Sequence, residues 1–195
     1  QFVTPIQLDL SGSVSADSFA DLTKIVENNQ VAFGNQYTWS SYNPTTRKVI
    51  YTQKADKLTI MDGSSQIIFT INANDQVVSY EQIYAGSVQV LGKERELITA
   101  QKAVEILYLA GRINSKATVQ SVKLSYYQSL VLKDFSIYSP AWYIEIRQAD
   151  GQLIARRVDA IHGTVLANET LETTNTQTQR TTTNNTTTTQ SVQQQ

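Results

Sequence analysis

Hydrophobic residues recur at helical spacing near the start of the chain. Phe19, Leu22 and Val26 lie three or four positions apart after a candidate N-cap at Ser15, and Asn28 then interrupts the pattern. This spacing predicts an amphipathic helix of about four turns. Alternating or β-branched runs separated by turn residues then predict strands at 37–42, 48–51, 67–71 and 77–90.

The same layout follows a second time. Thr99 is a candidate N-cap for a helix that places Ala103 and Leu107 on one face, and Gly111 is positioned to end this helix. Further strands are predicted at about 119–131, 141–148, 152–159 and 164–166.

Residues 141–148 give the clearest strand pattern. Trp142, Ile144 and Ile146 alternate with Tyr143 and Glu145, as a half-buried antiparallel strand requires. Asp150-Gly151 is a strong signal for a two-residue hairpin turn into the next strand.

Helices followed by meanders predict an α+β fold. We expect two related helix-plus-antiparallel-meander subdomains, residues 1–92 and 93–167, with a boundary in the charged stretch 92–96. The segment 168–195 holds 12 Thr, 6 Gln and 4 Asn. Because it has almost nothing to bury, we expect a disordered Thr/Gln/Asn-rich tail.

Composition narrows the function classes. The 16 Lys and Arg balance 17 Asp and Glu, which leaves no basic excess for nucleic acid. The chain has no cysteine, so disulfide scaffolds and thiolate zinc sites are excluded. No apolar run approaches the roughly 20 residues that cross a bilayer. The chain begins with Gln1, which suggests a cleaved or excised ectodomain.

Candidate catalytic residues are scarce. The single histidine, His162, lies three residues after Asp159, an acid that could serve as its catalytic partner. The favoured interpretation is structural: Asp159 caps backbone amides of a turn and Gly163 supplies a positive φ. The segment Asn72-x-Asn74-Asp75 lacks the glycine and the distal Glu of a calcium loop. We therefore predict no enzyme, no cofactor and no metal.

Other residues are assigned structural or surface roles. Tyr127 and Tyr143 are the candidates for a partner surface, because aromatic side chains bury much area at low entropic cost. The residues expected to shape the turns and the strand register are Pro140, Trp142, Asp150, Gly151, Asp159 and Gly163.

Three segments carry a resemblance to a known family. Residues 97–103 (LITAQKA), 138–144 (YSPAWYI) and 157–165 (RVDAIHGTV), with the repeated layout over 1–167, resemble the YycI family. The resemblance implies a non-enzymatic extracytoplasmic protein of a Gram-positive bacterium, anchored by an N-terminal transmembrane helix that is not in this chain. It implies association with a YycH-like protein and with the sensor histidine kinase WalK (YycG), and so an influence on cell-wall metabolism. A homo- or heterodimer is left open.

The last third also resembles a PepSY-type unit, in which a helix is followed by strands ending in Val-Asp-Ala-x-x-Gly. PepSY modules are associated with protease inhibition. The alternative function is therefore a secreted protease inhibitor or a cell-wall binding module.

Overall fold

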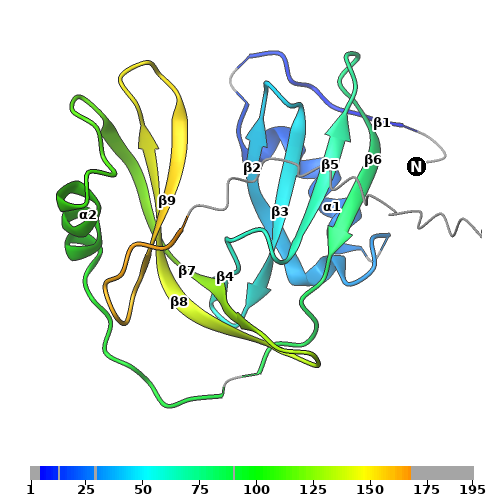
Figure 1. Cartoon of the computed structure of the whole chain (residues 1–195). Helices are drawn as coiled ribbons and strands as arrows, with labels where there is room; N and C mark the ends of the chain where they lie inside the picture. Colours follow the sequence, from blue (N-terminus) through cyan, green and yellow to red (C-terminus); the bar gives the residue numbers. More distant parts are fainter. Residues whose placement is uncertain (1–4, 13, 29, 90, 168–195) are drawn as a thin grey trace, which may run out of the picture.

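Two antiparallel sheets, each with a helix on one face, make up the folded part of the chain (Figure 1). The structure is a computed structural model, and it describes residues 5–12, 14–28, 30–89 and 91–167. The mixture of helices and antiparallel strands confirms the predicted α+β class. The tail predicted to be disordered, 168–195, lies outside the described residues, as does Gln1.

The first sheet has the order β1-β6-β5-β3-β2, and the short β4 also pairs with β3. All of these pairings are antiparallel. The strands are β1 (Ile6–Gln7), β2 (Tyr37–Asn43), β3 (Lys48–Ala55), β4 (Leu58–Thr59), β5 (Gln66–Ile71) and β6 (Gln76–Ile83).

The helical region before the first sheet differs in detail from its prediction. A 3-10 turn, η1 (Ala16–Phe19), precedes the helix α1 (Ala20–Glu27), and a second 3-10 turn, η2 (Gly34–Gln36), leads into β2. The backbone amide of Ser15 donates to the Ser18 hydroxyl across 3.2 Å at the start of η1. The predicted single four-turn helix is therefore wrong. The apolar spacing still places its side chains in one core with the sheet, where Phe19, Leu22 and Val26 are fully buried.

The second sheet has the order β7-β8-β9, formed by β7 (Thr118–Val131), β8 (Ser136–Arg147) and β9 (Leu153–Asp159). The helix α2 (Ala100–Leu109) covers one face of it (Figure 1). The Thr99 hydroxyl accepts the amide of Lys102 at 3.1 Å, which confirms the predicted N-cap. Ala103 and Leu107 pack on Ile144 and Ile146 in a core separate from the first.

Four strand predictions have the wrong extent. β3 continues to Ala55 instead of ending at residue 51. β6 ends at Ile83 instead of residue 90, because its partner β5 begins at Gln66, which is paired with Ile83. β8 begins at Ser136 instead of residue 141. The strand predicted at 164–166 is an isolated bridge between Val158 and Val165. Residues 84–99 connect β6 to α2, and the predicted boundary at 92–96 falls within this connection.

Candidate functional site: a cleft between the two sheets

The turn after β9 is built around the carboxylate of Asp159. Its Oδ1 atom accepts the backbone amides of Ile161 at 2.8 Å and of His162 at 2.7 Å. Its Oδ2 atom accepts the hydroxyl of Tyr127 at 2.8 Å. Gly163 has a φ of +68°, and its amide donates to the Asp159 carbonyl across 3.0 Å. The capping role predicted for Asp159 and the positive φ predicted for Gly163 are both confirmed.

Burial and hydrogen bonding act in opposite directions on Asp159. The residue is only 4% exposed, and burial alone would raise the pKa of its carboxyl. Donation from the His162 amide, the Tyr127 hydroxyl and the Ile161 amide outweighs burial, so the pKa of Asp159 is lowered. On the other side of the bond, burial and the Asp159 carboxylate raise the pKa of Tyr127 to about 12. Asp159 is thus an ionised acceptor and Tyr127 a neutral donor at neutral pH.

His162 stands at the solvent side of this turn. Its side chain is 71% exposed, and its Nδ1 atom lies 3.2 Å from Oδ1 of Asp159, which already accepts two amides. Within the described ranges, no cluster of three or more His, Cys, Asp and Glu side chains could hold a metal ion. The arrangement supports the structural interpretation of the Asp159–His162 pair.

The two tyrosines proposed as a partner surface lie on the face of the second sheet opposite α2. Tyr143 is paired with Lys123 on β7 and with Arg157 on β9. Burial and the nearby Glu145 charge raise the pKa of Tyr143 to about 12, so its hydroxyl is neutral. Both tyrosines are half-buried, and the Tyr127 hydroxyl is engaged by Asp159. This face is therefore polar and looks toward the first sheet (Figure 1).

The two sheets meet where the chain leaves β4. Ile60 forms a parallel bridge with Tyr126, and the Met61 amide donates to the Tyr126 carbonyl across 3.0 Å. The Asp62 carboxylate accepts the amide of Gln128. These contacts attach the first sheet to the outer edge of β7.

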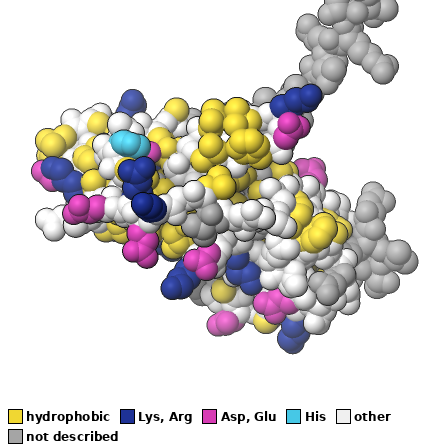
Figure 2. Space-filling view, turned by 90° about the horizontal axis from the view of Figure 1, so that it is seen from below, with side chains coloured by type: hydrophobic (Ala, Val, Ile, Leu, Met, Phe, Trp, Pro, Cys, Tyr) yellow, Lys and Arg dark blue, Asp and Glu magenta, His cyan; other side chains and the backbone are white. Residues whose placement is uncertain are grey.

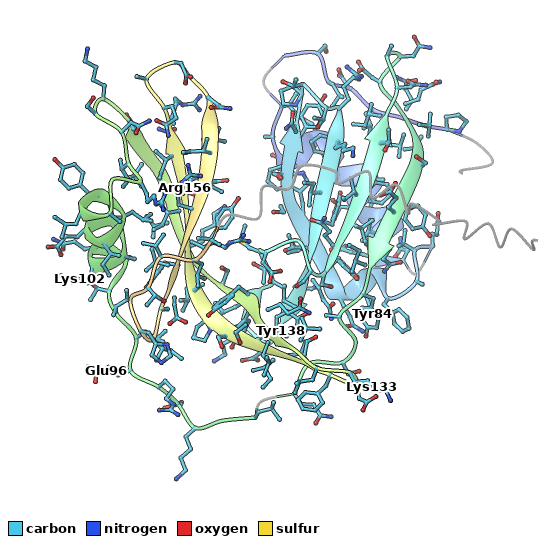
Figure 3. The ribbon with its side chains drawn as sticks, viewed as in Figure 1. Tyr84, Glu96, Lys102, Lys133, Tyr138 and Arg156 are labelled. Carbon is cyan, nitrogen blue, oxygen red and sulfur yellow. The ribbon has the colours of Figure 1, made fainter. Side chains whose placement is uncertain are left out.

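Two side chains of the second sheet reinforce this junction. Arg157 reaches from β9 and donates to the Met61 carbonyl across 3.2 Å. The Ser64 hydroxyl lies 3.4 Å from that of Tyr138, which Figure 3 labels on the long β7–β8 hairpin. Contacts from both β8 and β9 thus converge on residues 61–64.

Beside the junction lies a cleft of about 500 Å³. One wall comes from the first sheet and the segment before α1, and the other carries Lys123 and Glu145 of the second sheet. The Glu145 carboxylate accepts the Ser121 hydroxyl, and among the described residues Lys123 makes no ion pair. The cleft therefore presents one cation and one anion to a ligand or partner. The first wall is lined by Gly12, Val14, Trp39, Ser40, Ser41, Tyr42 and Pro44.

Pro140 and Trp142 lie within β8 and not in a turn. The Pro140 carbonyl accepts the amide of Ala160 across 3.0 Å, so its nitrogen faces the same side, just beyond the end of β9. A missing N–H costs little at that position, which is why a central strand tolerates proline here. Trp142 packs on the second core, and its Nε1 atom donates to the Ile98 carbonyl across 2.9 Å.

Asp150 and Gly151 form the turn between β8 and β9. The Asp150 carboxylate accepts the amide of Gln152 at 2.9 Å, and Gly151 has a φ of +87°. The Gln148 amide donates to the Gln152 carbonyl across 2.8 Å, so three residues, 149–151, form the loop. The predicted two-residue hairpin is wrong, because a left-handed residue after the first bend adds one position.

The sequence predicts neither the junction nor the cleft. The Asp62 carboxylate accepts the amide of Gln128, 66 residues away in the sequence. Lys123 and Glu145 belong to different strands, and nothing in their spacing links them to Trp39. Such sites have no local sequence signal.

A two-sheet domain with a cleft lined by charged and apolar side chains, whose one histidine is exposed at a structural turn, has the features of a binding or regulatory module. The chain belongs to the YycI family: the family model described as YycI protein matches residues 1–161. A search of curated proteins finds no match. The YycI family is a membrane-associated, extracytoplasmic family of regulatory accessory proteins of the YycG (WalK) system, and it is not known as enzymatic. No helix among the described residues is long and apolar enough to cross a membrane.

Proposed function

We propose that this chain is the extracytoplasmic part of an accessory protein that associates with a YycH-like protein and modulates the YycG (WalK) sensor kinase. The observation that carries the proposal is the family match over residues 1–161. An N-terminal transmembrane helix outside this chain anchors the protein and contributes the contact with the kinase. Through the kinase the protein influences cell-wall metabolism.

The cleft between the sheets is the proposed contact for the YycH-like partner. Lys123 and Glu145 offer both charges within one concave surface, and Tyr143 lies beside Lys123 in the sheet. Interfaces gain specificity when such charges meet complementary groups. The contacts at residues 60–64 support the proposal further, because they hold the two walls together before the partner binds.

Co-purification tests the function. The full-length protein, expressed with the kinase and the YycH-like protein in membranes, is expected to recover both. If neither the kinase nor the YycH-like protein is recovered from membranes that retain all three proteins, the proposal is wrong.

A charge reversal then tests the cleft. Lys123→Glu is expected to reduce recovery of the YycH-like protein, while Lys57→Glu, at an exposed turn outside the cleft, leaves it unchanged. Equal recovery with both variants would place the contact elsewhere, without affecting the association itself.

A PepSY-like protease inhibitor is the second candidate function. The observation that favours it is the order of α2, the three-strand meander and the Asp159 turn in residues 100–163. Inhibition of secreted proteases by this chain alone would support it, since an inhibitor needs no kinase. Unchanged protease activity at a large excess of the chain would eliminate it.

A further inference from the structure

The end of the β7–β8 hairpin carries an apolar face that neither core uses. The amide of Leu132 donates to the Phe135 carbonyl across 2.9 Å, so the chain reverses at Lys133 and Asp134. Leu130 is paired with Ile137 one step further along the hairpin. Because side chains alternate along a strand, four residues share one face of the hairpin end. They are Leu130, Leu132, Phe135 and Ile137.

The apolar side chains at this end are open to solvent. None of these exposed side chains belongs to either hydrophobic core of the described residues. The exposed fractions are 47% for Leu130, 65% for Val131, 42% for Leu132 and 56% for Phe135. Turn regions usually carry polar residues, and an exposed apolar run of this kind indicates an interaction surface. We call Leu130, Leu132, Phe135 and Ile137, with Lys133 and Asp134, the hairpin end.

The hairpin end projects away from the helix-covered part of the second sheet. It lies below the first sheet in Figure 1, and Figure 3 labels Lys133 there. Figure 2, which views the molecule from below, shows hydrophobic side chains gathered on this side, next to a basic and an acidic side chain. The surface is therefore accessible to another molecule.

The charges at the turn indicate that the other molecule is a second copy. Lys133 and Asp134 have opposite charges, and among the described residues neither forms an ion pair. A two-fold axis places Lys133 of one copy beside Asp134 of the other, so the surface is complementary to itself. Beyond Gln128, no described strand pairs with the outer edge of β7, so no neighbouring strand blocks the approach of a second hairpin.

We propose that the hairpin end is a self-association surface through which two copies of this chain form a two-fold dimer. The apolar faces of the two hairpins pack together, and two Lys133–Asp134 pairs flank them. Since the patch is small, the dimer is weak, with a Kd of about 10–100 µM. On the proposed function, which anchors the protein in a membrane, confinement to the membrane surface raises the effective concentration into this range.

Sedimentation equilibrium of the 195-residue chain between about 5 and 500 µM tests the proposal. The mean mass is expected to rise from 21.8 kDa toward twice that value. Leu132→Asp is expected to weaken association by at least about tenfold. Leu109→Asp is the control, because Leu109 is 73% exposed on α2, away from the hairpin end. A single-copy mass at every concentration overturns the proposal, as does association that Leu132→Asp leaves intact.

A charge exchange tests the two-fold arrangement even if Leu132→Asp fails to fold. Lys133→Asp and Asp134→Lys are each expected to weaken association by about tenfold, because each places like charges together. An equimolar mixture of the two variants is expected to associate as well as the natural chain. A mixture that stays monomeric contradicts the proposed pairing. These measurements use this chain alone and do not involve the kinase. Their result therefore does not decide whether the proposed function is correct.

Discussion

The hydroxyl of Tyr127 donates to Oδ2 of Asp159 across 2.8 Å, joining the middle of β7 to the turn that follows β9. Tyr127 is flanked by Tyr126 and Gln128, whose backbones bind the first sheet. The turn at Asp159 is therefore connected to the junction through one side chain. This connection makes the turn part of the mechanical link between the two sheets.

Removal of the Tyr127 hydroxyl is expected to destabilise the domain. Tyr127→Phe leaves one oxygen of the buried Asp159 carboxylate without its donor, which costs about 1–3 kcal/mol of unfolding free energy. Tyr108→Phe, at a residue 66% exposed on α2, is expected to change stability by less than about 0.5 kcal/mol. Chemical denaturation monitored by circular dichroism measures both, and equal effects would contradict the role assigned to the bond.

Acid should weaken the fold through Asp159. Its pKa in the folded chain is lowered, so its stabilising contribution is complete above the unfolded value of about 3.9 and is lost as pH falls through the folded value. Asp159→Asn is expected to lower stability at pH 7 and to flatten the decline below pH 4. Asp150→Asn, in an exposed turn, is the control and should retain the decline. Denaturation midpoints from pH 7 to pH 2 provide the measurement.

The junction is expected to loosen when Asp62 is replaced. Asp62→Ala removes the acceptor for the Gln128 amide and for the Ser64 amide at 2.9 Å. Hydrogen exchange at residues 60–64 and 126–128 should therefore accelerate, while exchange in α2 stays unchanged. Asp17→Ala, at an exposed residue of η1, should leave both regions unchanged. Unaltered protection of Gln128 in Asp62→Ala would show that the side chain does not hold the junction.

Trp142 and Trp39 differ in whether the indole N–H has a hydrogen-bond acceptor. Trp142→Phe removes the bond from Nε1 to the Ile98 carbonyl at 2.9 Å, whereas Trp39 Nε1 is buried and has no acceptor among the described residues. Both changes delete a similar volume. Trp142→Phe is therefore expected to cost about 1–2 kcal/mol more than Trp39→Phe. Thermal and chemical denaturation of both variants would reveal the difference, and a larger cost at Trp39 would contradict it.

Local features were predictable from the sequence. The alternation of Trp142, Ile144 and Ile146 with Tyr143 and Glu145 predicts a strand with one buried face, and the structure has this strand in the centre of the second sheet. Thr99 and Gly163 were assigned correctly because a cap and a positive φ depend on a few neighbouring residues. The extra loop residue at Gly151 was missed, since one Asp-Gly pair fits turns of two lengths.

The positions of the strand ends and the make-up of the site are set by residues that are distant in the sequence. The apolar residues after Ile83 favour a longer β6, but β5 offers no partner beyond Gln66. Pro140 favours a break, yet β8 continues through it because its nitrogen faces a position that β9 does not reach.

The sequence by itself determined the α+β class, the buried faces and the turn at Asp159, because periodicity and capping act over a few residues. Only the tertiary structure decided that Asp62 binds Gln128 and that Lys123 and Glu145 face Trp39 across a cleft. It also decided that the apolar residues after Gln128 remain uncovered. These outcomes follow from how two sheets meet, and the energy of that contact comes from pairs more than 60 residues apart.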